Sequence, residues 1–379
     1  MIALFLLCWG AIAGTVQVHV LDVGQGDAVL IEAPGDKKVL IDAGTGKSKV
    51  AQQLRERGIK KLNLVVGTHP HADHIGGMVE VLKSFEIGMY VDNGMTHNTL
   101  TYSRTARAIE NLGIPYRAGV RDRVFNIGDE VKLTVLHPRS TLLRGTRSDL
   151  NSNSVVLRVD HKDICFLLTG DAEDPTERAL LNGGLDECDV LKVAHHGSGH
   201  STSDSFLRAV KPRFAAASAG LKNRYGHPDE HTVARLASAG VTLHRTDLEG
   251  TITFTSDGKK VSVSTAKEAP STGPGATVLG GYAVHGDEPP LHTDETDAPG
   301  AVNINTADEA ALDQLPGIGP KRAAAIIAYR TQNGPFGSCG DLQRVYGIGP
   351  GTVTGVAGQC TVLAPKPKPK PEPKPEETP

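Results

Sequence analysis

Residues 14 to 265 alternate short apolar runs with segments of mixed polarity, a pattern that predicts a domain containing both strands and helices. The apolar runs have the length of strands and cover residues 16–23, 28–32, 39–43, 62–67, 131–136, 154–160, 164–169, 190–193, 214–217 and 251–254. Helical spacing is found in residues 49–57, which Gly58 ends, and in residues 231–239. Strands and helices mixed in this order favour two sheets covered by helices, an α/β architecture.

The pattern changes after residue 265. Residues 266–300 are rich in Pro, Gly, Thr, Asp and Glu and contain few large aliphatic side chains, which predicts a flexible linker. Residues 301–363 regain apolar periodicity and predict a small helical domain. Residues 364–379 alternate Pro with charged side chains, which favours a stiff, solubilising tail in the polyproline II conformation. The chain is therefore expected to contain two folded domains.

The first 13 residues form an apolar run that ends in Ala11-Ile12-Ala13. This small-residue ending is typical of a signal peptide cleaved after Ala13, and it predicts export to a periplasmic or extracellular location. The alternative is that the run forms a buried first strand. The run is too short to span a bilayer, and no other apolar stretch is long enough for a membrane helix.

Composition is that of a soluble globular protein, with 39% hydrophobic and 22% charged residues. The formal net charge is −3, so no global positive field attracts nucleic acid, and any contact with DNA must come from local patches or from metals. Beyond the leader, the chain contains four cysteines. An even number in an exported protein permits disulfides, and Cys339 with Cys360 is the favoured pair because both lie in the small domain. Free buried thiols are the alternative reading for Cys165, Cys188 and this pair.

The densest chemical signal is Thr68-His-Pro-His-Ala-Asp-His74, directly after the apolar run 62–67. It places His69, His71, Asp73 and His74 within six residues, where a strand end and a following loop can turn them toward one point. Neutral imidazoles and carboxylates suit Zn²⁺ and also Mn²⁺. The segment therefore predicts a metal site.

Other polar side chains follow apolar runs in the same way. Asp171 ends the run 164–169, His195 and His196 end the run 190–193, and His227 lies in a loop bounded by Gly and Pro. Asp42 lies near the end of the run 39–43. In a sheet, side chains at such strand ends converge at one edge, so these residues are candidate partners of the His69–His74 segment.

As a set, the segments 21–27, 40–44, 69–77, 153–157, 169–173, 195–198 and 225–228 resemble the metallo-β-lactamase superfamily, and within it the hydrolase domain of ComEC-type competence proteins. The resemblance covers nearly all of residues 16–265 and implies an αββα sandwich that binds two divalent metal ions, Zn²⁺ or Mn²⁺. It implies that His69 and His71 bind the first ion, that Asp73 and His74 bind the second with His195 closing that site, and that Asp171 bridges them. Asp42 would orient a metal-binding imidazole.

The superfamily often has a further His in the first site. Here His137 and the Asn-rich segment 151–154 are the candidates for that position, and the first site is expected to be either incomplete or completed by water or Asn. His196 and His227 are expected to bind metal or donate protons, and Asp73 also to orient the nucleophile. Lys222, Asn223 and Arg224 either contact phosphate or form a solvated turn. His161 is expected at the surface, in a turn between strands.

Two hairpin-like segments occur in residues 301–363, Pro316-Gly-Ile-Gly-Pro320 and Tyr346-Gly-Ile-Gly-Pro350. Thr306 is expected to cap a helix that begins near Ala307, with Glu309 completing a capping box, and a second helix is predicted from residue 320 to 333. The domain resembles the tandem helix-hairpin-helix domain of ComEA-type DNA receptors. The resemblance implies binding to the DNA backbone without sequence preference. The residues that would carry this binding are Gly317, Gly319, Lys321, Arg322, Gly347 and Gly349.

Together these features predict an exported, metal-dependent hydrolase, in first place a DNA phosphodiesterase (nuclease). A small-molecule phosphodiesterase or a lactone or ester hydrolase is the first alternative. A non-catalytic DNA-binding competence factor is the second. For the C-terminal domain alone, a protein–protein interaction module is the alternative to DNA binding.

Overall fold

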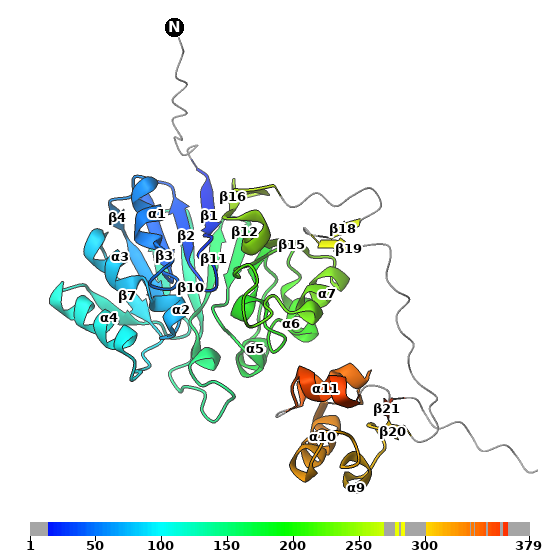
Figure 1. The fold of residues 1–379 in the computed structure, drawn as a ribbon. Helices are drawn as coiled ribbons and strands as arrows, with labels where there is room; N and C mark the ends of the chain where they lie inside the picture. Colours follow the sequence, from blue (N-terminus) through cyan, green and yellow to red (C-terminus); the bar gives the residue numbers. More distant parts are fainter. Residues whose placement is uncertain are drawn as a thin grey trace, which may run out of the picture. The chain divides into compact units, whose positions relative to one another are not determined.

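A computed structural model describes residues 14–268, 277–279, 282–284, 301–333, 335–336, 338–345, 348–356 and 359–362 (Figure 1). The chain divides into two compact units after residue 285. The predicted leader and tail lie outside the described residues. So does most of the predicted linker, in which β18 (Thr277–Leu279) and β19 (Tyr282–Val284) form a short antiparallel pair.

Two sheets form the first unit. The first sheet has the order β17-β16-β1-β2-β3-β5-β7-β8, with β1 (Val16–Val20), β2 (Val29–Ala33), β3 (Lys37–Ile41), β5 (Leu64–Gly67), β7 (Tyr90–Asp92), β8 (Tyr116–Ala118), β16 (Ile252–Ser256) and β17 (Val261–Thr265). The second has the order β15-β14-β13-β12-β11-β10-β9, with β9 (Val124–Ile127), β10 (Val131–His137), β11 (Val156–His161), β12 (Ile164–Leu168), β13 (Val190–Lys192), β14 (Phe214–Ala217) and β15 (Thr242–Arg245). Strands β3, β5, β7 and β8 run parallel, as do β12 to β15.

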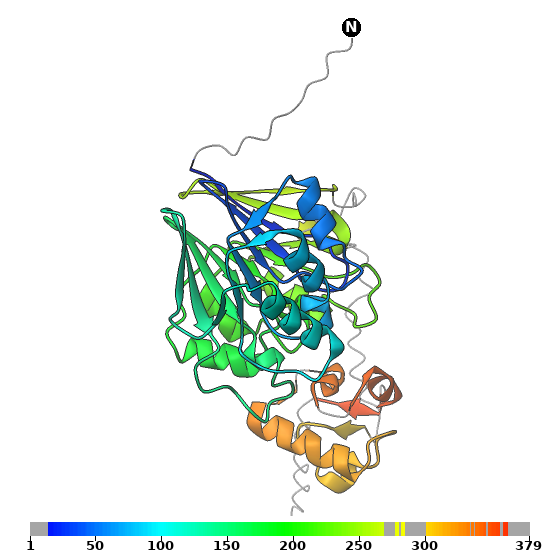
Figure 2. The ribbon, with the colours of Figure 1, turned by 90° about the vertical axis from the view of Figure 1, so that its left-hand side faces the viewer.

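Helices flank both sheets (Figures 1 and 2). On the side of the first sheet lie α1 (Val50–Glu56), α2 (Ala72–Ile75), α3 (Met78–Ser84) and α4 (Leu100–Asn111). On the side of the second lie α5 (Asp174–Leu181), α6 (Asp204–Val210) and α7 (Glu230–Ser238), and the short α8 (Thr246–Glu249) follows β15. A further short pair, β4 (Lys61–Leu62) and β6 (Glu86–Ile87), precedes β5 and β7. The result is an αββα sandwich, as the resemblance implied.

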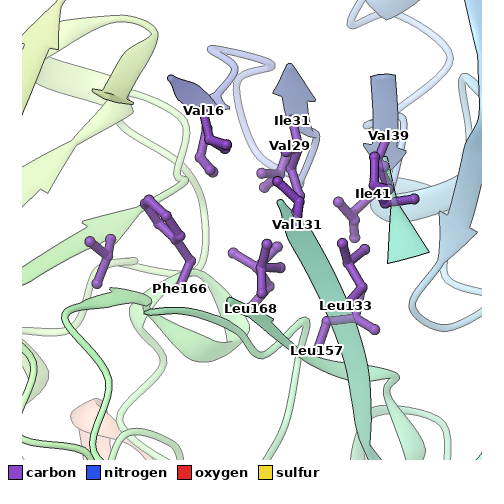
Figure 3. Packing of buried hydrophobic residues seen from close by; sticks show 14 of the residues in the cluster. Val16, Val29, Ile31, Val39, Ile41, Val131, Leu133, Leu157, Phe166 and Leu168 are labelled. Atoms are coloured by element: carbon purple, nitrogen blue, oxygen red, sulfur yellow. The ribbon is translucent and has the colours of Figure 1, made fainter. Parts of the chain in front are cut away.

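Along the buried strands β3, β5 and β12, side chains alternate between two hydrophobic layers. Val39 and Ile41 of β3 point into the space between the sheets, where they meet Leu133 and Leu157 of the second sheet (Figure 3). Leu40, between them in sequence, packs instead under the helices. Because both faces of β5 and β12 are covered, every residue of these two strands is apolar. This explains why the positions of these two strands are predictable from sequence to within two residues.

The prediction for His161 is wrong. It is the last residue of β11 rather than part of the turn, and it lies on the same face as Leu157 and Val159. Its side chain is therefore buried, and its Nδ1 lies 2.8 Å from Ser256 Oγ. The turn begins one residue later, at Lys162.

All four described cysteines form disulfides. Cys339 pairs with Cys360, as favoured from sequence, and Cys165 pairs with Cys188. The second bond joins β12 to the segment before β13 and lies in the layer under α5 and α6. The alternative of free thiols is thereby excluded for the structure described.

The second unit contains β20 (Val302–Asn303), α9 (Glu309–Leu312), α10 (Pro320–Asn333), a 3-10 turn at Cys339–Arg344, α11 (Pro350–Val356) and β21 (Cys360–Thr361). Helix α10 has the predicted bounds. The prediction that Thr306 caps the preceding helix is wrong, because that helix begins at Glu309 and the Asp308 carboxylate accepts the hydrogen bond from the Ala311 N–H. Thr306 belongs to the turn after β20. Within the described residues, no helix combines the length and apolar character that a membrane crossing requires.

Candidate metal centre

The segment from His69 to His74 lies where β5 ends and α2 begins. Strand β5 is buried between its neighbours β3 and β7. Its carboxyl end therefore has a fixed position at the end of the sheet where these parallel strands finish. His69 and His74 are buried, whereas Asp73 is about one-third exposed. His71 Nδ1 lies 2.9 Å from His69 Nε2. The close approach of Asp73 to the backbone of Gly26 leaves no room for a side chain there, which explains the glycine.

Asp171 stands between two groups of imidazoles. It follows β12, and its Oδ1 lies 3.2 Å from His74 Nε2 and 3.6 Å from His196 Nε2. Its Oδ2 lies 3.6 Å from His69 Nε2 and also 3.6 Å from His195 Nε2. One carboxylate therefore faces both groups, the arrangement expected of a bridging ligand.

His195 and His196 separate onto the two sides of Asp171. Both residues have left-handed backbone angles, with φ of 48° and 57°, which turns adjacent rings toward different neighbours. His196 Nε2 lies 3.4 Å from Asp73 Oδ2, so it stands with Asp73 and His74. His195 stands instead on the Oδ2 side with His69. The sequence-based assignment had placed His195, rather than His196, with Asp73 and His74.

The carboxylates of the cluster outnumber its permanent cations. Asp27, Asp42, Asp73 and Asp171 converge around the imidazoles, and Lys192 offsets one of them, with its Nζ 2.9 Å from Asp27 Oδ2. Among the described residues, no second Lys or Arg forms an ion pair with these four. Three negative charges in a largely buried site therefore require protonated imidazoles or bound cations.

The pKa values of the cluster reflect this demand for positive charge. Burial would lower the pKa of His74, but Asp171 and Asp42 raise it well above its usual range. Burial would likewise lower the pKa of His196, but Asp171 and Asp27 raise it to about 10. Burial would raise the pKa of Asp171, but His74, His196 and His195 hold it well below its usual range. The carboxylates of the cluster thus favour positive charge at the positions of His74 and His196.

Unpaired polar atoms point to the same conclusion. Within the described residues, His74 Nε2, His196 Nε2 and Asp171 Oδ1 are buried and form no hydrogen bond. Buried polar atoms are almost always paired, so unpaired atoms that converge indicate an absent ligand. The donor set of imidazoles and carboxylates fits two divalent cations.

Asp42 orients one of the candidate ligands, as predicted. Its Oδ2 lies 2.7 Å from His74 Nδ1 and accepts a bond from Thr68 Oγ1, while its Oδ1 accepts the Thr68 N–H. His74 can therefore present only Nε2 to the cluster. Glu173 plays a similar part on the other side, where its Oε1 lies 3.4 Å from His195 Nδ1 and accepts a bond from Asn151 Nδ2.

The variant Asp42→Asn is expected to weaken metal binding by about 10- to 100-fold, because His74 loses a charged orienting partner. A titration with Zn²⁺ or Mn²⁺ against a competing chelator measures this. Asp36→Asn is the matched control, since Asp36 has the same φ of 59° but is exposed and remote from the cluster. Equal metal affinity for Asp42→Asn and the wild type would refute the orienting role.

Asp27, Lys192 and Glu173 were not identified as site residues from sequence alone. Asp27 lies in the turn after Gly24-Gln-Gly26, and Lys192 lies inside a buried strand. Two signals in the sequence could have identified them. Lys192 is a charged residue within an apolar run, and Glu173 is a carboxylate two residues after the candidate ligand Asp171. A buried lysine needs a partner, but its partner lies 165 residues away in sequence.

Of the two candidates for the further ligand of the first site, the Asn segment reaches the cluster and His137 does not. Asn151 Nδ2 lies 3.5 Å from His195 Nε2. His137 is buried, and its Nε2 lies 3.0 Å from the Ser152 carbonyl oxygen. His137 therefore holds the turn that carries Asn151 rather than standing among the candidate ligands.

Burial lowers the pKa of His137 to about 4. Between about pH 6.5 and 4 the unfolded chain binds the proton and the folded protein does not, so stability is lost as pH falls through this window. The loss from His137 is expected to be roughly 3 kcal/mol. The free energy of unfolding, measured with denaturant from pH 7.5 to 4, tests this. Its fall with pH should be smaller in His137→Gln and unchanged in His231→Gln, a substitution at an exposed position. An unchanged slope in His137→Gln would contradict the assignment.

His227 lies beside the cluster, with its ring 5.6 Å from that of His195 and 6.3 Å from that of His196. Burial lowers its pKa to about 4, so the ring is neutral at pH 7. Asn223 shapes the loop that presents it, because Asn223 Oδ1 accepts the N–H groups of Tyr225 and His227. Lys222 and Arg224 are exposed, and Arg224 stacks over the Tyr225 ring at 4.8 Å.

The C-terminal unit repeats one backbone pattern twice. In the first hairpin Ile318 N donates to Leu315 O, and in the second Ile348 N donates to Val345 O, both at 3.0 Å. Gly319 and Gly349 precede α10 and α11 and have open space where a side chain would stand. Gly317 has a φ of 74°. Lys321 is exposed, Arg322 donates to the Gly317 carbonyl, and Gly347 lies outside the described residues.

The sequence model of the metallo-beta-lactamase superfamily matches residues 21–220, more than half of the chain, and that of the helix-hairpin-helix motif matches residues 298–361. With the sandwich and its His/Asp cluster, this match shows that the chain belongs to the metallo-beta-lactamase superfamily.

Individual relatives fall into two groups. The hydrolase domain is similar to ComE operon protein 3 of Bacillus subtilis (30% identity over 259 residues, 63% of this chain and 33% of that protein). It is also similar to competence protein ComA of Neisseria gonorrhoeae (32% over 242 residues, 62% and 32%). The C-terminal unit is similar to ComE operon protein 1 of B. subtilis (44% over 61 residues, 16% and 30%). The chain thus spans about a third of the length of these relatives.

Among solved structures, the metallo-beta-lactamase fold protein YhfI of B. subtilis aligns with a TM-score of 0.44 at 12% identity, covering 64% of this chain and 100% of that one.

Proposed function

We propose that this protein is an exported, metal-dependent phosphodiesterase that cleaves DNA. The observation that carries the proposal is the presence, in one chain, of a His/Asp cluster arranged around a central carboxylate and a tandem hairpin unit with open glycines. Hydrolysis alone would fit many substrates, and the hairpin unit favours a polymer with a phosphate backbone. A relative whose name is competence protein ComA is in keeping with this choice.

The geometry supports two metal positions, one on each side of Asp171. His69, His71 and His195 would hold the first ion, and Asp73, His74 and His196 the second. Two divalent cations held there, Zn²⁺ or Mn²⁺, would supply Lewis acidity at the phosphate and activate water for attack. This allocation moves His195, first expected to close the second site, to the first ion, and gives its place at the second ion to His196.

Asp73 and His227 have separate roles in the proposed reaction. Asp73 is the most exposed carboxylate of the cluster, so it stands where substrate and attacking water enter and can orient that water. His227 is half-buried with an unpaired Nδ1 and is not among the candidate ligands. Its neutral ring can accept a proton from water and return one to the leaving oxygen. The phosphorus gains the oxygen of water and loses the bond to the sugar oxygen.

Export is supported by the two disulfides. Structural disulfides persist in oxidising compartments and are rare in the reducing cytosol. The four cysteines after the predicted leader are all paired. A fusion to a reporter that is active only outside the cytosol tests export directly, and a reporter inactive with an otherwise stable fusion would refute it.

The activity is tested by incubating the full chain with plasmid and linear DNA in the presence of Mn²⁺ or Zn²⁺, with and without chelator. Cleavage that depends on the metal is expected. A folded protein that binds the metal but cleaves neither DNA would refute the proposal. If such a protein still hydrolysed small phosphodiesters or lactones, the small-molecule alternative would take its place.

A further inference from the structure

A cavity of about 670 Å³ lies between α4 and the strands β7 and β8, at the edge of the first sheet. Because β7 and β8 are parallel, α4 must carry the chain back from the carboxyl ends of the strands to their amino ends. The start of α4 is therefore near His69, and its end is remote. His69 and Pro70 form part of the cavity wall, so the cavity adjoins the candidate metal centre.

The wall combines aromatic and apolar groups with one fixed carboxylate. Tyr90, Tyr102 and Tyr116 line it, three of the seven tyrosines in a chain with few aromatics. Tyr90 and Asp92 lie two residues apart on β7, so both face α4. Ile75, Met95, Ile109 and Ile114 complete the apolar part of the wall. A cavity of this volume far exceeds a packing defect and is of the size that small ligands occupy.

Asp92 is held in place at this wall. Its Oδ1 accepts hydrogen bonds from the Tyr116 hydroxyl and the Gly94 N–H, both at 2.8 Å. The described residues donate no hydrogen bond to its Oδ2. An oriented carboxylate oxygen among aromatic rings can accept a hydrogen bond from an amino group on a flat ligand, as carboxylates do from the amino group of cytosine.

We propose that this cavity, the α4 pocket, binds the nucleobase beside the phosphate that is cleaved, with a preference for bases that carry an exocyclic amino group. The nucleotide class of this ligand rests on the proposed function. Tyr90 is buried, whereas Tyr102 and Tyr116 expose part of their side chains. These two rings provide the stacking surface that single-stranded nucleic acids require. Glu110 lies at the far end of the pocket, where its carboxylate would repel phosphate, so the base points inward and the phosphate remains at His69.

Binding of mononucleotides tests the pocket without relying on cleavage. The full chain is titrated with dCMP, dTMP and deoxyribose 5-phosphate by calorimetry or ligand-observed NMR, both with Mn²⁺ and after its removal. We expect dCMP to bind about tenfold more tightly than deoxyribose 5-phosphate, the effect of stacking one base, and more tightly than dTMP. Equal affinity for dCMP and the base-free sugar phosphate would overturn the proposal.

Three variants locate the binding. Asp92→Asn keeps an acceptor for Tyr116 and Gly94 and should remove the preference for dCMP over dTMP. Ala106→Trp adds a ring to an exposed part of the wall. It should lower the affinity for dCMP and dTMP to about that for deoxyribose 5-phosphate. Asn111→Ala, on α4 but outside the wall, should change neither. Wild-type nucleotide affinity in a folded Ala106→Trp protein would place the base elsewhere.

The pocket and the proposed function can fail separately. Metal-dependent DNA cleavage by a wild type that shows no base effect would reject the pocket and leave the nuclease standing. Base-dependent binding without DNA cleavage would support the pocket and reject the nuclease. Displacement of dCMP by an aliphatic acid such as octanoate, at concentrations where acetate has no effect, would assign the cavity to an apolar chain and so overturn the proposal.

Discussion

Replacement of Asp171 by Asn is expected to lower the rate of DNA cleavage by about 1000-fold. Asp171 is the one carboxylate whose two oxygens face the two groups of imidazoles, so an amide leaves both metal positions without a shared anionic ligand. Metal-ion catalysis contributes several kcal/mol, and about 4 kcal/mol corresponds to three powers of ten in rate. The measurements are metal content by elemental analysis and the initial rate of plasmid cleavage.

The control for Asp171→Asn is Asp163→Asn, the same change at an exposed turn of the same sheet. Asp163→Asn should retain both metal and rate. If Asp171→Asn also bound two equivalents of metal and cleaved DNA at the wild-type rate, Asp171 would not be the bridging ligand.

The double variant Gly319→Val, Gly349→Val is expected to raise the KM for long DNA by about 100-fold while leaving kcat nearly unchanged. Neither glycine has a left-handed φ, and a Cβ at either position meets no atom within 4 Å. Their lack of a side chain is therefore not required by the fold and fits close approach of an outside backbone. Losing one of two linked binding sites removes avidity of this order.

Hydrolysis of a small chromogenic phosphodiester separates this effect from damage to the metal centre, since its rate should not change in the double variant. Ala310→Val introduces the same side chain at an exposed position of α9 and should leave the KM for DNA as it is. An unaltered KM in a folded double variant would favour the protein–protein alternative for the C-terminal unit.

The sequence predicts the fold where one interaction decides the structure. Strands such as β5 and β12 are apolar because both faces are covered. Helix α10 begins at Pro320, a residue that favours the first turn of a helix. Less is predictable where two local solutions compete. Thr306 and Asp308 are both good helix caps, but Thr306 is part of a hydrogen-bonded turn that follows β20, and the helix is capped by Asp308. His161 is polar but lies on the inward face of its strand.

Site residues follow the same rule. Strand ends identify His69, Asp171 and the pair His195-His196, because polar residues after apolar runs are visible in sequence. Their division into two groups is not visible, since it depends on two consecutive left-handed residues. The ion pair of Asp27 with Lys192 and the disulfide of Cys165 with Cys188 depend on tertiary contacts that no local pattern encodes.

The candidate ligands come from both layers of the sandwich. His69, Asp73 and His74 follow β5 of the first sheet, whereas Asp171, His195 and His196 follow β12 and β13 of the second. A cation bound by both groups joins the sheets and is held only by the folded chain, so it adds about 2.7 kcal/mol of stability at a hundredfold excess over its dissociation constant. The unfolding temperature should therefore rise with the free metal concentration of the surroundings, and metal supply would govern how long the enzyme survives as well as how fast it works.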